Sequence, residues 1–400
     1  MKRKTIRRRP PGRRAALLVV LIVSAVLLPV VFVMWPGAPV NTLGKSVSQD
    51  YLPAEVTDVA FDNCGNVSDD VPCGSATGTL ADGKTVDVML FRNAYFNDVS
   101  NGDDVVISEA TTPGAERSYT YYSPQRGGTL AIFALGALGL VALAVGFRGL
   151  RAFVSLLASA VFIWYFLIGG IAADGSPLLY SSVTVVFVLT AVLFYTHGLS
   201  AMTIAAWAGT LIGLCVAMAV GSALSWLLRL GPAGENAEML TLSGLTVPVE
   251  SIALAALLIV LIGVLNDISA AQASTVFSHL GAALPDGEGR EMPARAGGGR
   301  RSWWRTVRDS SLNVGRDHAA SAIYTVSFSV VGAGLFTLIL SQTFGLPLGV
   351  VLQSDEVATT LTQMIAGIVG IVVTMPATTV IAVTLARWFA GSAVERVPRH

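Results

Sequence analysis

The sequence predicts an all-α polytopic membrane protein with a small β-rich, OB-like domain between its first two transmembrane helices. Three observations predict this fold class. The chain of 400 residues is 53% hydrophobic and 13% charged, whereas a soluble domain carries roughly 25% charged residues. Eight apolar runs are long enough to cross a bilayer, which takes roughly 20 residues. A polar, acidic segment separates the first run from the second.

The eight apolar runs follow one another from the N-terminus to the C-terminus. The first is too long for the core of a signal peptide, and no small-residue cleavage site follows it, so we expect an uncleaved signal anchor. The predicted spans are Ala15–Trp35, Thr129–Phe147, Ala152–Ala172, Leu178–Thr196, Leu199–Leu228, Glu250–Phe277, Ala319–Phe344 and Leu361–Phe389.

The distribution of charge predicts the orientation of these spans. Eight of the 26 basic residues lie within Lys2–Arg14, and 13 of the 26 acidic residues lie within Asp50–Glu116. Basic segments stay on the cytoplasmic side of a membrane, so we expect both termini to be cytoplasmic. The predicted order is a basic cytoplasmic N-terminus (1–14), a signal anchor (15–35), an extracytoplasmic β domain (36–128), a seven-helix transmembrane domain (129–390) with a cytoplasmic loop (278–318), and a cytoplasmic tail (391–400).

Residues 36–128 contain short runs of β-branched and aromatic residues separated by turn signals, which predicts five strands and a partly closed barrel of the OB type. The segment is acidic rather than basic, so we expect it to contact an envelope component or its own membrane domain, and not nucleic acid. The predicted strands are Ala54–Phe61, Gly74–Leu80, Thr85–Phe91, Val105–Ser108 and Arg117–Tyr122.

Two cysteines, Cys64 and Cys73, lie nine residues apart in this segment. In an oxidising compartment they could close a short disulfide loop, and the alternative is two free thiols. The segment contains no histidine, and two thiolates alone make a poor zinc site, so we expect no metal.

Asp267 is the acidic residue that interrupts a continuous apolar stretch, in the sixth span. A carboxylate inside a bilayer is costly unless it is paired, protonated or hydrated, so it indicates a functional site. A structural acid that pairs with the next helix is the alternative. The polar residues beside it are Asn266, Ser269, Gln272 and Ser274.

The expected partner of this acid is Arg316, at the start of the seventh span. Arg316 is the natural counter-charge for Asp267 or Asp317. A polar stripe continues from there into the span, although isolated hydroxyls in such helices often bond their own backbone. Its members are Asp317, His318, Ser321, Tyr324, Thr325 and Ser329.

Three further patterns concern packing and helix ends. Gly209, Gly213, Ala217 and Gly221 recur every four residues, which predicts close helix packing. A proline, Pro376, interrupts the eighth span, with three threonines nearby to satisfy freed backbone groups. The stretch 302–314 has the pattern of a short interfacial helix.

No Walker A run, Rossmann glycine fingerprint or His-Glu-x-x-His motif is present in the sequence. No local nucleophile–base signature occurs either. We therefore expect no catalytic residues, no cofactor and no enzymatic activity.

The stretch from Gly263 to Ser274, followed by Val314–Ser321, resembles the YibE/F-like family of bacterial multi-pass membrane proteins. The signal anchor, the outer domain and the seven further spans also fit that family. The form with Gln272-Ala273-Ser274 and Tyr324-Thr325 is similar to the actinobacterial branch, in which the residue at Asn266 is commonly a second aspartate. This chain keeps one acid there, which argues against a paired-carboxylate or divalent-cation mechanism. The resemblance implies location in the bacterial cytoplasmic membrane and little about activity.

The leading hypothesis is a secondary transporter or exporter, in contact with the lipid bilayer, that moves a small molecule or ion past Asp267, Arg316 and Asp317. The alternative is a non-transporting envelope assembly or signalling scaffold whose β domain binds an external protein, or which forms a homo-oligomer. A membrane-embedded enzyme is the third and least supported hypothesis.

Overall fold

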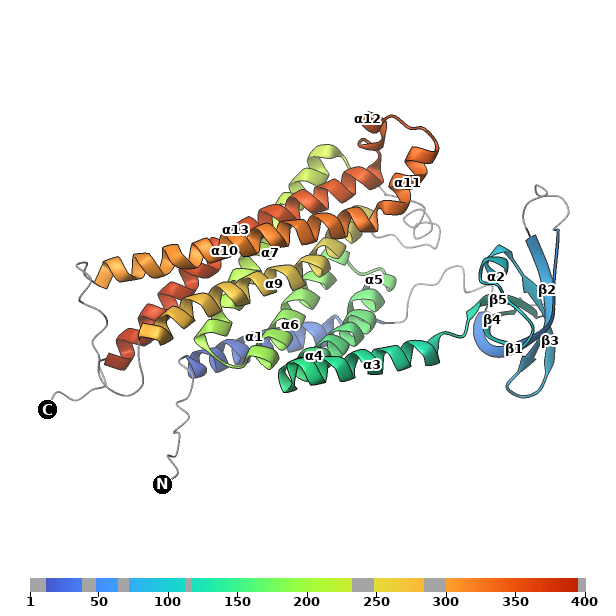
Figure 1. Cartoon of the computed structure of the whole chain (residues 1–400), viewed down its shortest axis with the longest axis horizontal. Helices are drawn as coiled ribbons and strands as arrows, with labels where there is room; N and C mark the ends of the chain where they lie inside the picture. Colours follow the sequence, from blue (N-terminus) through green and yellow to red (C-terminus); the bar gives the residue numbers. More distant parts are fainter. Residues whose placement is uncertain are drawn as a thin grey trace, which may run out of the picture. The chain divides into compact units, whose positions relative to one another are not determined.

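The protein divides into two compact units in the computed structural model, which describes residues 12–37, 48–63, 72–111, 117–231, 248–283 and 300–394 (Figure 1). One unit holds Asn41–Leu150, and the other holds Met1–Val40 with Arg151–His400. The first is built on a β-barrel and the second on a bundle of helices.

Five strands of the first unit close into a barrel in the order β1-β2-β3-β5-β4, with β4 pairing back onto β1. All pairs are antiparallel except β3 with β5. The predicted small five-stranded barrel is confirmed. Its elements are β1 (Ser48–Asn63), β2 (Pro72–Leu80), β3 (Thr85–Leu90), the short helix α2 (Arg92–Phe96), β4 (Asp103–Thr111) and β5 (Ser118–Pro124).

The long strand β1 closes the barrel because it pairs with β2 along one part and with β4 along another. A register shift between Thr57 and Ala60 bends the strand, as β-bulges do in small barrels. Gly74 of β2 lies at this bend, and a Cβ there would be 2.0 Å from the carbonyl oxygen of Ala60. The bend therefore requires glycine at position 74.

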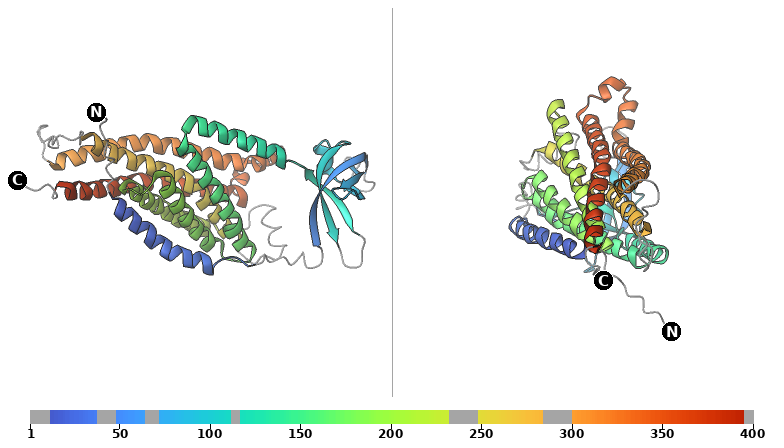
Figure 2. Two further views of the ribbon diagram at one scale, coloured as in Figure 1. Left: turned by 90° about the horizontal axis from the view of Figure 1, so that it is seen from below. Right: turned by 90° about the vertical axis from the view of Figure 1, so that its left-hand side faces the viewer.

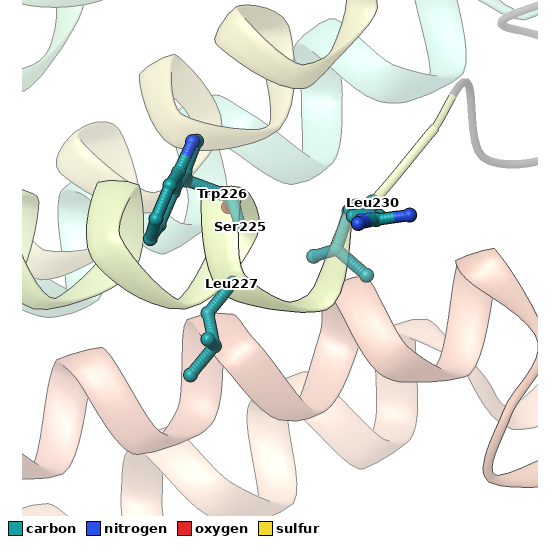
Figure 3. Close-up of a pocket in the computed structure, with 5 residues that line it drawn as sticks. Ser225, Trp226, Leu227 and Leu230 are labelled. Atoms are coloured by element: carbon teal, nitrogen blue, oxygen red, sulfur yellow. The ribbon is translucent and has the colours of Figure 1, made fainter.

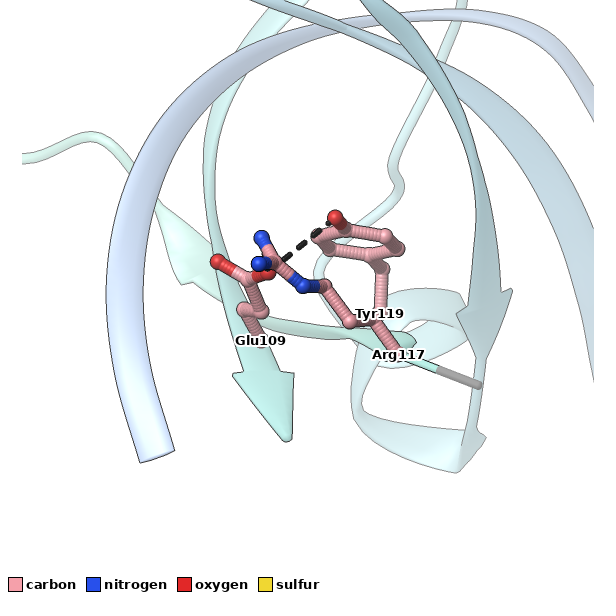
Figure 4. Close-up of polar contacts among 3 residues, drawn as sticks. All are labelled: Glu109, Arg117 and Tyr119. Carbon is pink, nitrogen blue, oxygen red and sulfur yellow. Dashed lines mark hydrogen bonds and ion pairs between the residues drawn. The ribbon is translucent and has the colours of Figure 1, made fainter. Parts of the chain in front are cut away.

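Alternating apolar side chains fill the barrel, including Val56, Val88 and Ile107, as the two-residue period of strands requires. At one end of β4 the carboxylate of Glu109 is also buried. It accepts hydrogen bonds from Arg117 (2.8 Å) and from the hydroxyl of Tyr119 (3.2 Å), as Figure 4 shows. The hydrogen bond to Glu109 and its negative charge raise the pKa of Arg117. The barrel thus holds its buried acid in a satisfied network.

The cysteines of the chain differ in their state. Cys73 lies on β2 and is not a free thiol, whereas Cys215 is free. Cys64 lies outside the described residues. The Cys64–Cys73 bridge therefore stays a prediction.

Seven helices among the described residues are long and apolar enough to cross a membrane, and a bent pair adds an eighth candidate span. The seven helices and the bent pair together coincide with the eight apolar runs of the sequence, which are confirmed as helices. The helices are α1 (Arg13–Val33), α3 (Gly127–Val145), α4 (Phe147–Phe162) continued by the π-helical turn η2 (Ile163–Ile168) and α5 (Gly169–Ala172), α6 (Pro177–His197), α7 (Ala201–Leu228), α9 (Val249–Ala283), α10 (Arg300–Ala333) with α11 (Leu335–Thr343), α12 (Leu348–Val351) and α13 (Asp355–Val394).

The centre of the second unit is formed by α7, α9 and α13, with α10 against α9 and α13. In the end-on view of Figure 2, α13 (red) lies between α7 and α10. Apolar residues such as Leu258, Leu265 and Ile371 fill this core. The first helix joins the bundle at its edge, where the hydroxyl of Tyr180 donates to the carbonyl of Met34 at 2.8 Å.

The small residues of α7 face α13 and allow the two backbones to approach closely, as predicted. A Cβ at Gly209 would be 1.9 Å from Thr378 Oγ1, and one at Gly213 would be 1.7 Å from Thr374 Oγ1. Ala217 and Gly221 are buried on the same side of α7. The α7–α13 contact is therefore the tightest constraint on the bundle.

Two expectations about segment 278–318 are corrected. The predicted loop is helical at both ends, because α9 continues to Ala283 and α10 begins at Arg300. The stretch 302–314 is not a separate interfacial helix but the first part of α10. Val307, Ser311, Gly315 and Ala319 are all buried, so one packed face runs through the expected boundary and keeps the helix continuous.

The tight contact predicts opposite effects for two glycine substitutions. Gly213→Ala should lower the melting temperature of the purified protein, because its Cβ would collide with Thr374 and lie 3.2 Å from the carbonyl of Gly370. Gly263→Ala on α9 is the matched control. Its Cβ would meet nothing within 4 Å, and alanine favours helix by about 1 kcal/mol over glycine. Equal melting temperatures for the two variants would contradict this account.

Candidate functional site

A cluster of buried polar residues lies where α9, α10 and α13 meet. We call Ser269 and Gln272 of α9, Ser311 of α10, and Thr378 and Thr379 of α13 the polar junction. None of the five is more than 2% exposed. Polar groups inside a bundle of apolar helices are costly unless they pair with one another, because neither lipid nor an apolar core offers partners.

The amide of Gln272 links the three helices of the polar junction. Its Nε2 donates to the backbone carbonyl of Ser311 at 2.7 Å and to the hydroxyl of Thr379 at 2.6 Å. One turn away, the hydroxyls of Ser269 and Thr378 are 3.3 Å apart. Because the amide uses both of its donors on different helices, it fixes the registers of α10 and α13 against α9.

Glycine makes room for this amide. A Cβ at Gly315 of α10 would be 2.5 Å from Gln272 Oε1 and 2.7 Å from Met375 Cγ. Gly315 belongs to the Val314–Ser321 stretch that carries the family resemblance, and its role is close approach rather than chemistry.

Two polar atoms near this point are buried without a hydrogen-bond partner among the described residues: Ser311 Oγ and Asn266 Oδ1. Leaving such a group unpaired costs about 1–3 kcal/mol. The polar junction therefore retains hydrogen-bonding capacity that the resting fold does not use.

The charged residues predicted for the site lie on the opposite side of their helices. Asp267 is exposed, whereas Ile268, Ser269 and Gln272 are buried. At 3.6 residues per turn, Asp267 and Ser269 lie on nearly opposite faces of α9. Asn266 lies between the two faces and is half-buried, and Ser274 is exposed with Asp267.

The polar stripe of α10 is likewise exposed, and the expected ion pair is not formed within the described part of the chain. Arg316 donates instead to Asn313 Oδ1 at 2.9 Å. The packed face of α10 carries Ser311 and Gly315, which turns the stripe outward. Its exposed members are Arg316, Asp317, His318, Ser321, Tyr324, Thr325 and Ser329.

The structure thus brings together two of the predicted residues, Ser269 and Gln272, and adds three that the sequence interpretation missed. The sequence interpretation gave Thr378 and Thr379 only the role of satisfying backbone groups freed by Pro376. They do bond the carbonyls of Thr374 (2.8 Å) and Met375 (2.9 Å), in addition to their contacts with α9. A sequence signal for this face of α13 did exist. Gly209 and Gly213 of α7 are four residues apart, as are Thr374 and Thr378 of α13, and Gly209 faces Thr378 while Gly213 faces Thr374.

Cavities outside the polar junction differ in character. One of about 560 Å³ surrounds the C-terminal end of α7, where Ser225, Trp226, Leu227 and Leu230 line it (Figure 3). Trp226 is 82% exposed, as tryptophans at the ends of membrane helices often are. An apolar cleft of about 400 Å³ lies between α4 and α6. A smaller cavity of about 170 Å³ contains the carboxylate of Glu356.

The comparison with protein families identifies the helical part of the chain. Residues 133–295 and 299–388 match the family described as YibE/F-like protein. This match covers more than half of the chain. The chain belongs to the YibE/F-like family. The matched residues run from α3 to α13 and include the polar junction, whereas the barrel lies outside them.

Neither a curated protein nor a solved structure matches this YibE/F-like chain. The family membership confirms the resemblance on which the sequence interpretation depended.

Removal of the Gln272 amide should destabilise this YibE/F-like protein. Gln272→Met keeps an unbranched side chain but removes the hydrogen bonds to the Thr379 hydroxyl and to the carbonyl of Ser311, each worth about 0.5–1.5 kcal/mol. We expect a lower melting temperature in detergent. Gln342→Met, at an exposed glutamine of α11, is the matched control and should leave the melting temperature unchanged. An equal fall in melting temperature for both substitutions would show that the polar junction does not stabilise the fold.

Proposed function

We propose that this YibE/F-like protein is a multi-pass membrane protein that acts as a secondary transporter or exporter of a small molecule or ion. The observation that carries the proposal is the polar junction, a hydrogen-bonded network at the centre of a bundle of apolar helices. Polar groups in such a place are costly and are typically retained for function. Transport supplies a reason for polar groups with unused bonding capacity, such as Ser311.

The broken span supports the same proposal. The pair α10–α11 bends by 53° at Gly334, between Ala333 and Leu335. Discontinuous helices are a recurring feature of substrate and ion sites in secondary transporters, because their ends present unpaired backbone groups. The polar stripe of α10 ends at Ser329, one turn before this break.

The exposed charges of α9 and α10 belong to the proposed path. Charged side chains within spanning helices face water or protein rather than lipid. A single chain leaves Asp267, Arg316 and Asp317 on its surface, so the proposal places a hydrated path or a second copy of the chain against them. Asp267 is then the charged group that contacts the substrate, and Arg316 and Asp317 complete its polar surroundings.

The proposed orientation follows from the basic residues. The N-terminus, the segment between α9 and α10, and the C-terminus are cytoplasmic, and the barrel is extracytoplasmic. Eight spans, with the bent pair counted as one, would return the C-terminus to the side of the N-terminus.

Cysteine labelling tests this orientation. In a cysteine-free background, cysteines introduced at Ser75 and at Gly298 should react from opposite sides of intact cells. Ser75→Cys should react with an impermeant maleimide directly, and Gly298→Cys only after permeabilisation. Reaction of both from outside would overturn the proposed topology.

An envelope scaffold is the second candidate function, and one observation favours it. Exposed aromatic side chains of the barrel, Phe61, Tyr95 and Phe96, border a cleft of about 570 Å³ that Asp98 and Asn101 also line. Aromatic residues around a cleft are typical of binding surfaces. The strand order of the barrel, with its one parallel pair, supports an OB-type module, a fold that often binds other molecules through one face.

A substitution at the acid separates the two functions. Because Asp267 is exposed, Asp267→Asn should leave the melting temperature unchanged but abolish complementation of a deletion strain, measured as the return of accumulated metabolites to parental levels. Asp309→Asn, at an exposed acid already paired with Arg308 at 2.8 Å, is the control and should complement.

Full complementation by Asp267→Asn would exclude the acid from the mechanism, because the amide carries no negative charge. Loss of complementation by Phe61→Ala together with Tyr95→Ala, with Asp267→Asn fully active, would favour the scaffold instead.

A further inference from the structure

The small cavity at the broken end of α10 has the composition of an ion site. It has a volume of about 170 Å³ and lies between α9, α10 and α13. Its lining contains oxygen-bearing side chains and a single charged group, the carboxylate of Glu356. The lining includes Val260 of α9, Ser329 and Ala333 of α10, and Glu356, Thr360 and Gln363 of α13.

The carboxylate of Glu356 has a hydrogen-bond donor but no cation beside it. The hydroxyl of Thr337 on α11 donates to Glu356 Oε1. Within the described part of the chain, no lysine, arginine or histidine forms an ion pair with Glu356. Glu356 lies in the first turn of α13, where the helix dipole favours a negative charge. A half-buried carboxylate with one hydroxyl partner there still has lone pairs free to accept a ligand.

Neutral oxygens surround this charge. The Thr360 hydroxyl donates to the backbone carbonyl of Glu356 at 2.8 Å, so its oxygen lone pairs remain available. Gln363 Nε2 donates to the carbonyl of Ala253 at 2.8 Å, which leaves Gln363 Oε1 as the free acceptor of that amide. Ser329 adds a hydroxyl at the exposed rim.

The C-terminal end of α10 lies at the same place. The last carbonyls of a helix have no intrahelical partner and carry the negative end of the helix dipole. The C-terminal end of α10, at Ala333, lines the cavity, and α11 begins only at Leu335 with a change of direction. The C-terminal ends of broken helices coordinate Na⁺ in known transporter architectures.

We propose that this cavity binds a monovalent cation, Na⁺, held by the carboxylate of Glu356 with the oxygens of Thr360, Gln363 and Ser329. One carboxylate neutralises one monovalent charge. A divalent ion recruits more carboxylates, and the described residues contain no cluster of three acidic, cysteine or histidine side chains. The site goes beyond the proposed transport function, because cation binding is measurable whether or not the protein transports.

Thermal unfolding of the purified full-length protein tests the site. At constant ionic strength, replacement of choline chloride by NaCl should raise the melting temperature in a saturable manner, because a ligand that binds only the folded state stabilises it. An equal rise with choline and Na⁺ would show a general salt effect and overturn the site. Stabilisation by Ca²⁺ but not by Na⁺ would equally overturn it.

Two variants tie the effect to the cavity. Glu356→Gln should weaken the apparent affinity for Na⁺ by about tenfold or more, which corresponds to about 1.4 kcal/mol. Thr360→Val keeps the shape and the charge of the cavity and should also weaken binding. Asp355→Asn is the matched control, because it removes one negative charge at an exposed neighbouring position that is outside the cavity lining.

Unchanged Na⁺ affinity in a folded Glu356→Gln protein would overturn the proposal. If that variant does not fold, the comparison of Thr360→Val with Asp355→Asn decides: equal affinities overturn the site, and a selective loss in Thr360→Val supports it. Asp267→Asn should bind Na⁺ normally, so failure of the transport proposal and failure of the ion site give different results.

Discussion

The two hydrogen bonds donated by the Gln272 amide are the constraint on which the described arrangement of α9, α10 and α13 depends. They hold Ser311 of α10 and Thr379 of α13 against the same turn of α9. With Gln272 beside Ser311 and with Val260 and Ser329 lining one cavity, α9 and α10 run antiparallel in a fixed register. That register turns the Arg316–Ser329 stripe outward and places the end of α10 beside Glu356.

The sequence was sufficient to predict the helices and the strands because their signals are local. Apolar runs of spanning length predicted the helical spans, and a run of β-branched and aromatic residues between turn signals, Thr85–Phe91, predicted a strand of the barrel. Small residues every four positions predicted the packed face of α7. These patterns each depend on one element, so no knowledge of a partner element is needed.

The site was predicted only in part because it depends on which helix faces meet. The pattern around Asp267 showed a polar segment on α9, but Asp267 and Gln272 lie on different sides of it. The sequence interpretation placed the site at the charged residue Asp267, whereas the packed side of α9 carries the neutral residues Ser269 and Gln272. Gln272 and Thr379 are 107 positions apart, and no local pattern joins them. The break at Gly334 was hidden for a related reason, because the residues on both sides of it form one apolar run, Ala319–Phe344.

The distribution of tight and loose contacts limits which part of the bundle can move in the proposed transport cycle. The backbones of α7 and α13 approach through Gly209 and Gly213, where even one methyl group collides, so these helices can slide past each other only with a large steric penalty. At the polar junction α10 is held by the Gln272 amide and by the close approach of Gly315, and it ends in a bend of 53°. The atoms that Gly315 approaches belong to side chains, whereas Gly209 and Gly213 of α7 also approach backbone atoms of α13. Exchange of two hydrogen bonds is a far smaller barrier than the repacking of a glycine contact. The transport cycle that we propose would therefore move α10 and α11 against a rigid α7–α13 pair, and that motion would change the polar junction and the Glu356 cavity together.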